Sequence, residues 1–303
     1  MVYHRLMLIS ILTLLLFTMG CFEENNHPGK APNTIYVDDD GIADYTSIQD
    51  AIDAAPDNYT IFVYSGVYEE NIFINKNITL IGEDPKTTII NASHFGNVIH
   101  ITKKGRATIQ GFTLCNSGNS GYPRYNAGVK VESNGNNITG NIMKNNRCGI
   151  YADSSSHNNF SFNIFSNNSD YGIFLHGRSD HNIIYHNVFI HNTCALRIKT
   201  CMFVTVHMNV FLKNDKGMYF CCGARENIAH HNTFINNSIW NADDLVGENQ
   251  WDDGEEGNYW SDYTGVDENN DGIGDTPYSF TTHGEDRYPL MSPPVVYEEE
   301  LEG

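Results

Sequence analysis

Asn141-Ile-Met-Lys-Asn-Asn146 is the first of five similar blocks that decide the fold of this chain. The later blocks are Asn163-Ile-Phe-Ser-Asn-Asn168, Asn187-Val-Phe-Ile-His-Asn192, Asn209-Val-Phe-Leu-Lys-Asn214 and Asn232-Thr-Phe-Ile-Asn-Asn237. Their first asparagines are separated by 22, 24, 22 and 23 residues. Such a period, with short β-branched and aromatic runs split by Asn and Gly, is typical of a β-solenoid.

Apolar residues in and around these blocks alternate along the chain, which turns one side of every strand inward. The asparagines fall where the chain must turn, because Asn tolerates left-handed backbone angles. Stacked amides can also hydrogen-bond along a column. We therefore predict an all-β fold, a single right-handed parallel β-helix with coils of about 22–24 residues and structural asparagine columns.

The segment 45–55 is the one convincing helix pattern. Its apolar residues recur at helical spacing: Ile48, Ala51, Ile52 and Ala55. Ser47 can cap its N-terminus, and Pro56 ends it. Because the end of a solenoid exposes unpaired strand edges, we expect this short helix to cap the first coil.

Charge and length limit the partners of the protein. The 303 residues carry a net charge of −19, which disfavours nucleic acid and anionic lipid as partners. The acidity fits a soluble surface protein, a cation binder or a protein that lives in salt, and composition does not separate these. We expect a monomer that contacts a membrane only through an N-terminal lipid.

Residues 1–21 are predicted to be an export signal with a lipoprotein processing site. His4 and Arg5 precede an apolar run too short to span a membrane stably. Thr18-Met-Gly-Cys21 resembles a lipobox, with Cys21 as the lipid-bearing residue, although Thr18 replaces the usual aliphatic residue. A simple secretory cut and an uncleaved anchor are the alternatives. We expect an exported, cell-surface protein anchored through Cys21, with a tether at 22–33.

The rest of the chain divides into three predicted parts: a β-helix at 34–249, a C-terminal capping module at 250–291 and an acidic tail at 292–303. Export permits disulfides. Cys201 and Cys222 fall at the same turn of adjacent coils, so a Cys201–Cys222 bond is predicted, with Cys201–Cys221 as the alternative. No C-x-x-C pair supports a zinc ribbon.

Three parts of the chain resemble known proteins. Ile48-Gln-Asp-Ala-Ile-Asp-Ala-Ala55, with Gly66-Val-Tyr-Glu-Glu70 and Ile78-Thr-Leu-Ile-Gly82, resembles the first segment of right-handed parallel β-helix proteins of the pectinesterase, lyase and NosD-like families. The repeats resemble those of carbohydrate-acting and sugar-binding domains. Gly257-Asn-Tyr-Trp-Ser-Asp-Tyr-Thr-Gly265 with Asp271-Gly-Ile-Gly-Asp-Thr-Pro-Tyr278 is similar to the C-terminal module of NosD-like surface proteins, common among archaea.

Charged residues on outward faces or turns are the candidates for work on a polysaccharide: Glu132, Asp153, Asp170, Asp180, His176, Arg178, Arg197 and Lys199. Acid–base chemistry on a sugar needs paired carboxylates and a cation to hold uronate. Arg197-Ile-Lys199 resembles the basic triplet of polygalacturonases, but the paired aspartates and the Gly-His-Gly element of that family are missing. The leading hypothesis is therefore non-catalytic binding of carbohydrate or of envelope components. A polysaccharide lyase, hydrolase or C5-epimerase is the alternative.

Histidines suggest a second alternative, because imidazole is a favoured ligand of copper and zinc. The residues two before each repeat asparagine form an outward column, with His207 and His230 on adjacent strands. Met208 and His231 occupy the next column, and residues that face two ways across a strand cannot all reach one ion. A copper site from His207 and His230, with help from Met208, fits the copper-handling role that the NosD resemblance implies.

The segment 267–275 has the spacing of a calcium loop. Oxygen ligands stand at positions 1, 3, 5 and 9, and the position 7 carbonyl completes the set: Asp267, Asn269, Asp271, Asp275 and Ile273. Position 12 is Tyr278 rather than Glu, so Asp262 or Asp286 would have to supply the last ligand. Calcium would lock the C-terminal module, and a plain Asp/Asn/Gly turn is the alternative.

Overall fold

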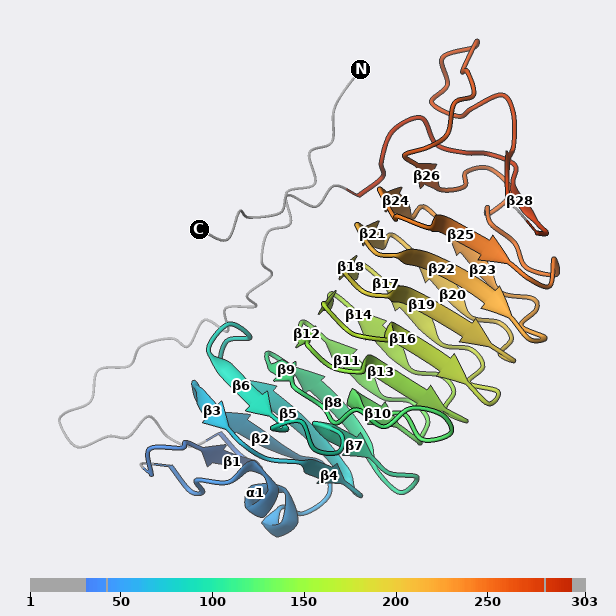
Figure 1. The fold of residues 1–303 in the computed structure, drawn as a ribbon. Coiled ribbons are helices and arrows are strands. Elements are labelled where there is room, and N and C mark those ends of the chain that lie inside the picture. Colours follow the sequence, from blue (N-terminus) through green and yellow to red (C-terminus); the bar gives the residue numbers. More distant parts are fainter. Residues whose placement is uncertain (1–30, 42, 281, 296–303) are drawn as a thin grey trace.

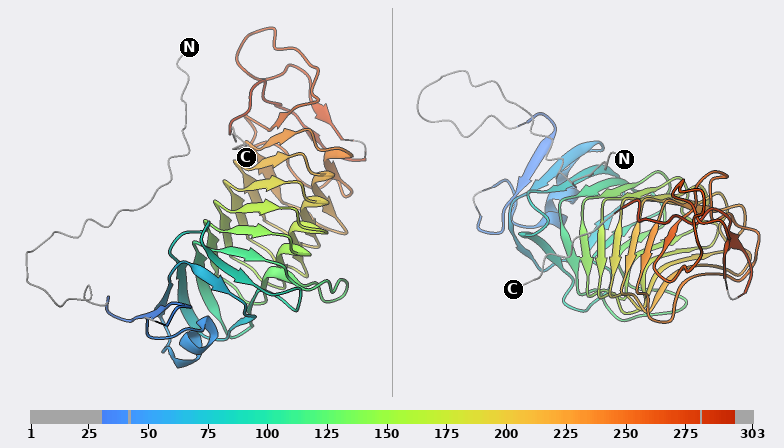
Figure 2. Two further views of the ribbon diagram at one scale, coloured as in Figure 1. Left: turned by 60° about the vertical axis from the view of Figure 1, so that its left-hand side comes forward. Right: turned by 90° about the horizontal axis from the view of Figure 1, so that it is seen from above.

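The computed structural model describes residues 31–41, 43–280 and 282–295. The predicted export signal and Cys21 lie outside these residues. The described chain is a right-handed parallel β-helix, as predicted, in which successive strands pass from one sheet to the next and the coils stack along one axis (Figures 1 and 2).

Three parallel sheets form the sides of the solenoid. Sheet A contains β1 (Thr34–Val37), β2 (Tyr59–Val63), β5 (Asn77–Gly82), β8 (Arg106–Gln110), β11 (Asn137–Thr139), β14 (Asn159–Ser161), β17 (Ile183–Tyr185), β20 (Thr205–His207) and β23 (Ile228–His230). Sheet B contains β3 (Gly66–Tyr68), β6 (Thr88–Asn91), β9 (Thr113–Cys115), β12 (Ile142–Lys144), β15 (Ile164–Ser166), β18 (Val188–Ile190), β21 (Val210–Leu212), β24 (Thr233–Ile235) and β26 (Tyr259–Trp260). Sheet C contains β4 (Ile72–Ile74), β7 (Ile99–Ile101), β10 (Ala127–Val131), β13 (Cys148–Asp153), β16 (Tyr171–His176), β19 (Cys194–Lys199), β22 (Lys216–Cys221) and β25 (Trp240–Asp244).

A column of stacked aromatic side chains fills part of the interior. The middle residues of the sheet B strands stack ring on ring: Phe165, Phe189, Phe211, Phe234 and Trp260. Neighbouring ring centres are 4.4–4.9 Å apart, close to the spacing of the strands themselves. The alternation of apolar residues therefore places one aromatic ring per coil in the core.

Asparagines line the turns as buried ladders. Between sheets A and B the ladder contains Asn141, Asn163, Asn187, Asn209, Asn232 and Asn258. In each step the Oδ1 of one asparagine accepts the backbone N–H of the asparagine in the preceding coil, at 3.0 Å for Asn163 and Asn187. The predicted hydrogen-bonded column is confirmed, but the left-handed backbone angle lies at the residue before the asparagine, as at Phe162 and His186.

Helix α1 (Ile48–Ala54) covers the N-terminal end of the stack, as the sequence predicts (Figure 1). Ser47 Oγ accepts the N–H of Asp50 at 3.2 Å, which is the predicted N-cap. Glu70 adds a second cap, because its carboxylate accepts the N–H of Ile48 at 2.8 Å. The buried face of α1, which includes Ile52, closes the first coil.

Parallel pairing continues past the boundary expected at residue 249. Gln250 bridges to Ile228, and β26 pairs with β24. Asn258 also extends the asparagine ladder by one coil. The solenoid therefore runs into the segment expected to be the capping module, which corrects that boundary. The short hairpin β27 (Tyr278–Ser279) and β28 (Glu285–Asp286) follows it.

The predicted disulfide is not formed. Every cysteine in the described part of the chain is a free thiol: Cys115, Cys148, Cys194, Cys201, Cys221 and Cys222. The register places Cys221 opposite Lys199, two residues before Cys201, and Cys222 is exposed at the following turn. A spacing counted along the sequence was too coarse to place these thiols face to face.

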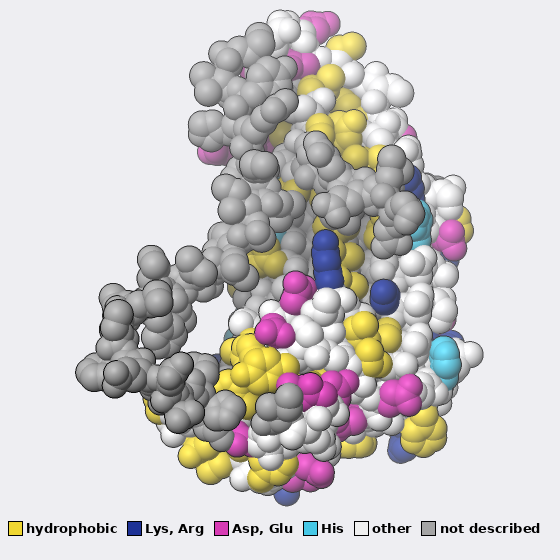
Figure 3. Space-filling model, turned by 90° about the vertical axis from the view of Figure 1, so that its left-hand side faces the viewer, with side chains coloured by type: hydrophobic (Ala, Val, Ile, Leu, Met, Phe, Trp, Pro, Cys, Tyr) yellow, Lys and Arg dark blue, Asp and Glu magenta, His cyan; other side chains and the backbone are white. Residues whose placement is uncertain are grey.

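The outer face of sheet B carries an apolar strip, and Figure 3 looks at this side of the molecule. Val188, Ile190, Val210 and Leu212 form the strip, and Val295 packs against it. The Val295 carbonyl accepts a hydrogen bond from Thr233 Oγ1 at 2.9 Å. The described start of the predicted acidic tail, residues 292–295, therefore reaches the solenoid.

Within the described ranges, no helix has both the length and the apolar character needed to span a bilayer.

Candidate metal centre

The turn after β23 bends a second histidine toward the first. β23 ends at His230, and the next residue, His231, has a positive φ of 54°. The residues at the same turn of the preceding coils share this left-handed conformation: Gly140, Phe162, His186 and Met208. Strict strand alternation ends at this position, so consecutive side chains no longer point to opposite faces.

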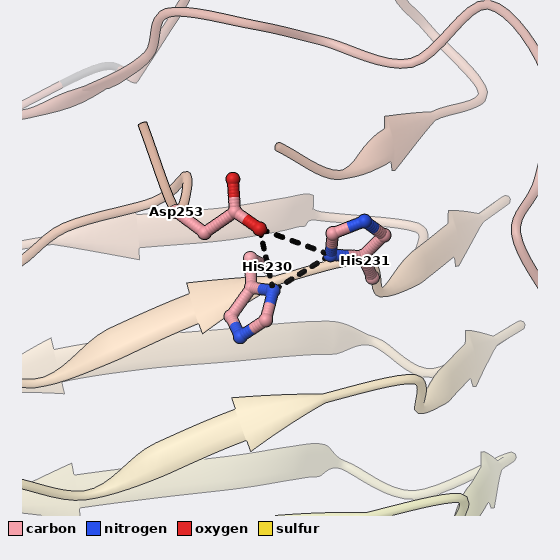
Figure 4. Close-up of side chains that lie close together, drawn as sticks. All are labelled: His230, His231 and Asp253. Atoms are coloured by element: carbon pink, nitrogen blue, oxygen red, sulfur yellow. Dashed lines mark hydrogen bonds and ion pairs between the residues drawn. The ribbon is translucent and has the colours of Figure 1, made fainter. Parts of the chain in front are cut away.

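His230, His231 and Asp253 form a compact triangle of ligand atoms (Figure 4). The two Nδ1 atoms are 2.6 Å apart, and Asp253 Oδ2 lies 3.7 Å from His230 Nδ1 and 3.9 Å from His231 Nδ1. A point inside this triangle lies about 2.0 Å from all three atoms, which is the length of zinc bonds to imidazole nitrogen and carboxylate oxygen. Over residues 31–41, 43–280 and 282–295, this is the only such group of His, Cys, Asp or Glu.

A tight turn holds Asp253 with one oxygen free to face the histidines. Its Oδ1 accepts the backbone N–H groups of Glu255 at 2.9 Å and of Glu256 at 2.8 Å. Burial acts to raise the pKa of the Asp253 carboxyl, but these backbone hydrogen bonds outweigh it and hold the pKa below its usual range. Asp253 is therefore an ionised carboxylate whose orientation is fixed by its own turn.

Glu256 fixes the orientation of His231. Its Oε2 lies 2.7 Å from His231 Nε2 and accepts that N–H. When its one proton is on Nε2, the Nδ1 of His231 has a free lone pair, which lies 2.6 Å from Nδ1 of His230. A carboxylate behind a metal-binding histidine is the usual outer partner that sets the tautomer and the ring orientation.

Burial keeps His230 neutral. It lowers the pKa of His230, and the positive charge of a protonated His231 would lower it further, while Asp253 acts in the opposite direction. Metal binding requires unprotonated imidazoles, so this environment favours an ion over a proton. Two imidazole nitrogens and one carboxylate suit Cu²⁺ and Zn²⁺, and the general order of affinity favours Cu²⁺.

His207 lies beside this triangle but is not part of it. As the alternation predicts, His207 and His230 are register partners, and their rings stack with centres 5.5 Å apart and planes 8° apart. Tyr185 stacks on the other face of His207 at 5.4 Å. Burial, followed by the charges of neighbouring histidines, lowers the pKa of His207 to about 4.

The close ligand atoms therefore belong to His230 and His231, whereas the predicted pair, His207 and His230, stack face to face. The expectation that residues facing two ways cannot share an ion was wrong for these two histidines, because the left-handed turn redirects His231. Asp253 was missed altogether. The sequence signal was Asn258, which follows Asn232 after 26 residues and so marks an enlarged turn at 252–256.

The predicted calcium loop is closed by its own hydrogen bonds. Asp267 accepts the N–H groups of Asp271 and Gly272 at 3.2 and 2.9 Å, and Asp275 accepts that of Glu268 at 2.7 Å. Of the described side chains, the three loop aspartates do not gather into a group with close ligand atoms. Calcium binding by this loop stays a prediction.

The predicted charged candidates are distributed among several separate contacts. Glu132 pairs with Lys130 at 2.7 Å, and Asp170 pairs with Arg147 at the same distance. Asp180 accepts a backbone N–H, and Arg178 is exposed at a turn. The remaining four lie together on sheet C: Asp153, His176, Arg197 and Lys199.

Comparison with known proteins adds the following similarities. Residues 52–265 match the family model described as "Periplasmic copper-binding protein (NosD)". Proteins named "Probable ABC transporter binding protein NosD" from Stutzerimonas stutzeri and Pseudomonas aeruginosa are 37% and 34% identical to this chain over 84 residues. That segment is 28% of this chain, but it spans only 19% and 20% of those relatives.

Two pectin-modifying enzymes are also similar. Pectinesterase 3 of Solanum lycopersicum is 38% identical over 61 residues, which is 18% of this chain and 11% of that protein. Pectin methylesterase from carrot matches in structure with a TM-score of 0.31 and 15% identity, over 72% of this chain and 69% of that chain.

Proposed function

Because the chain belongs to the NosD family, described as periplasmic copper-binding proteins, we propose that it binds copper outside the cytoplasm through His230, His231 and Asp253. The observation that carries this proposal is the triangle of two imidazole nitrogens and one carboxylate oxygen. Its sides leave room for one ion at ordinary ligand distances. The predicted export of the chain is consistent with the location named for the family.

The donor set favours Cu²⁺ over Cu⁺. Thiolate and thioether ligands select Cu⁺, whereas imidazole and carboxylate ligands suit Cu²⁺ in a tetragonal arrangement. The two histidines lie next to each other in the chain and present nitrogens 2.6 Å apart, which fits neighbouring corners of such an arrangement. Water or a partner molecule would complete the coordination.

Copper would take the place of a proton. If His230 Nδ1–H donates to His231 Nδ1, 2.6 Å away, a metal ion between the two nitrogens would require that proton to move to Nε2 of His230. Glu256 keeps the proton on Nε2 of His231, on the far side of that ring. The protein therefore holds the two Nδ1 atoms together in advance, while each ring can keep its own proton on Nε2.

Calorimetric titration of the metal-free protein with Cu²⁺ tests this proposal. We expect one tight equivalent, with an affinity that falls as the pH is lowered because protons compete with the ion for the imidazole nitrogens. His230→Ala and His231→Ala should each weaken binding by about 100-fold or more. His191→Ala is the matched control, because His191 is exposed at a different turn and should bind copper as the unchanged protein does. Equal affinity in all four proteins would exclude this site.

Non-catalytic binding of carbohydrate or envelope components, with calcium in the C-terminal loop, is a separate proposal. The acidic loop and the sheet faces motivate it, and the copper site neither requires nor excludes it. One described feature bears on it directly, which is the group of aromatic and basic side chains on sheet C.

A further inference from the structure

A cleft of about 400 Å³ opens on the outer face of sheet C. Aromatic side chains and two cations line it: Tyr122, Tyr125, Tyr151, Phe174, Arg197 and Lys199. The volume lies within the range of small-molecule binding sites, about 300–1,000 Å³. None of the three residues of the copper site lines this cleft.

The register of the sheet brings these side chains together. Tyr151, Phe174 and Arg197 are successive partners in β13, β16 and β19. Two residues further along the same strands, Asp153 and His176 are partners, and their side chains are 3.2 Å apart. Because side chains two apart share a face of a strand, the two rows form one continuous surface.

Arg197 is held rigidly at the floor of the cleft. Its guanidinium lies over the rings of Phe174, Tyr171 and Tyr219, with 5.0–5.6 Å from Cζ to the ring centres. Nη1 donates to Tyr171 Oη at 2.7 Å, and Nε donates to the sulfur of Cys221 at 3.4 Å. Cation–π contacts and two hydrogen bonds thus orient the fork, while Nη2 makes none of the described hydrogen bonds.

The two cations of the cleft carry no carboxylate partner among the described residues. Arg197 and Lys199 are both partly buried, and neither forms any of the described ion pairs. Burying a cation costs free energy unless an anion compensates it. In a chain with a net charge of −19, acids were abundant enough to pair with these cations, so an external anion is the natural partner.

A preformed wall borders the cleft. The segment 116–126 between β9 and β10 carries Tyr122, which is 79% exposed, and Tyr125, whose ring lies 5.4 Å from that of Tyr151. Arg147 anchors this segment, because its Nη1 donates to the carbonyl and side-chain oxygens of Asn119 at 2.9 and 2.8 Å. The aromatic rim is therefore in place before a ligand binds.

We propose that this cleft binds a uronic acid residue of an acidic saccharide. Arg197 and Lys199 would hold the carboxylate, since guanidinium donors match its two oxygens. Asp153 and His176 present acceptors and donors for ring hydroxyls. Tyr122 at the rim offers an exposed ring face for the apolar side of a pyranose. A small anion would use the cations but would leave the aromatic rim and the Asp153 side unused.

Binding of di- and trigalacturonate, measured by calorimetry in the presence of EDTA, tests this proposal. We expect saturable binding that is at least about tenfold tighter than binding of galactobiose and of acetate. Arg197→Gln and Lys199→Gln should each weaken it at least about tenfold, and Tyr122→Ala should weaken it about threefold or more. Arg178→Gln is the matched control, because Arg178 is exposed and does not line the cleft.

The variants also distinguish loss of uronate binding from misfolding and from an effect of the copper site. Tyr122 is exposed, so Tyr122→Ala tests the cleft even if Arg197→Gln fails to fold. His231→Ala should leave uronate binding unchanged, which distinguishes this cleft from the copper site. Equal affinity for galacturonate, galactobiose and acetate would overturn the proposal, and so would binding that survives both Lys199→Gln and Tyr122→Ala.

Discussion

The inner and outer sides of the turn between sheets A and B differ sharply. On the inside, six coils in succession place the same residue: Asn141, Asn163, Asn187, Asn209, Asn232 and Asn258. On the outside, the residue before each of the first five asparagines varies in type, although all five have a positive φ: Gly140, Phe162, His186, Met208 and His231. One backbone geometry thus supports a fixed interior and a variable surface.

The difference follows from the partners of each side chain. An inner asparagine bonds the coils on both sides, so a substitution disturbs two neighbours at once. An outer side chain meets solvent and one or two other side chains, so its chemistry can vary without loss of the fold. Chemical variety is therefore found on the outer side, and the proposed copper site lies where an enlarged turn brings Asp253 beside His230 and His231.

Substitution on the inside should have the largest effect. Asn187→Ala removes donation to the Phe160 carbonyl at 2.8 Å and to Asn209 Oδ1 at 3.0 Å, and leaves the buried N–H of Asn163 without its acceptor. We expect the free energy of unfolding to fall by about 3–5 kcal/mol. Urea unfolding followed by circular dichroism measures this change.

The matched control is the outer neighbour. His186→Ala, at the adjacent position of the same turn, should change the free energy of unfolding by less than about 1 kcal/mol. If Asn187→Ala and His186→Ala lowered the free energy of unfolding by similar amounts, the two sides of the turn would not differ as described.

Next in size is the effect of the carboxylate behind His231. Glu256→Gln keeps the shape of the side chain but removes the negative charge that accepts the His231 Nε2–H at 2.7 Å. Loss of such an outer partner typically lowers metal affinity about 10–100-fold. We expect at least a tenfold weaker Cu²⁺ affinity and little change in stability. An unchanged affinity would show that Glu256 has no part in the site.

A pH effect on stability comes from His207. Its folded-state pKa is about 4, below the ordinary value of 6.5, so the unfolded chain takes up a proton at a higher pH than the folded protein does. The contribution of neutral His207 to stability is therefore fully present above pH 6.5 and is lost as the pH falls from 6.5 to about 4.

His207→Phe isolates this effect, because it keeps a ring between Tyr185 and His230 but cannot be protonated. Both proteins should lose free energy of unfolding between pH 7 and pH 4. The loss should be about 1–2 kcal/mol smaller in His207→Phe than in the unchanged protein, a figure reduced to account for the partial solvent exposure of His207. Urea unfolding at both pH values measures the difference. Parallel pH profiles for the two proteins would contradict the prediction.

The smallest effect is expected at Met208. Sequence reasoning placed its sulfur near the copper, but the triangle contains His231 instead. Met208→Leu conserves volume, so we expect less than about threefold change in Cu²⁺ affinity and under about 1 kcal/mol in stability. A tenfold loss of copper affinity would restore Met208 as a ligand.

Much of the fold was predictable because its cause is local and repeated. The spacing of the Asn141–Asn146 block and its copies sets the length of each coil, and the apolar alternation sets which side faces inward. The helix after Ser47 was predictable for the same reason, since its cap and its apolar face lie within a few residues. The prediction of a Cys201–Cys222 bond was wrong because it requires the exact residue-to-residue register between neighbouring strands, which the spacing does not give.

The candidate site was only half predictable. Alternation correctly places His207 beside His230, but it fails at His231, where the backbone turns left-handed. Asp253 arrives from an enlarged turn whose path no periodicity describes. When a turn does not follow the repeat, the position of its side chains depends on how the chain folds in three dimensions. The sequence period contains little information about that position.

The most direct test of copper binding at the triangle is a crystal structure of the copper-loaded protein with anomalous scattering recorded at the copper edge. We expect one strong anomalous peak about 2.0–2.2 Å from Nδ1 of His230, Nδ1 of His231 and Oδ2 of Asp253. A peak between the His207 and His230 rings, or at the loop 267–275, with none in the triangle would contradict it.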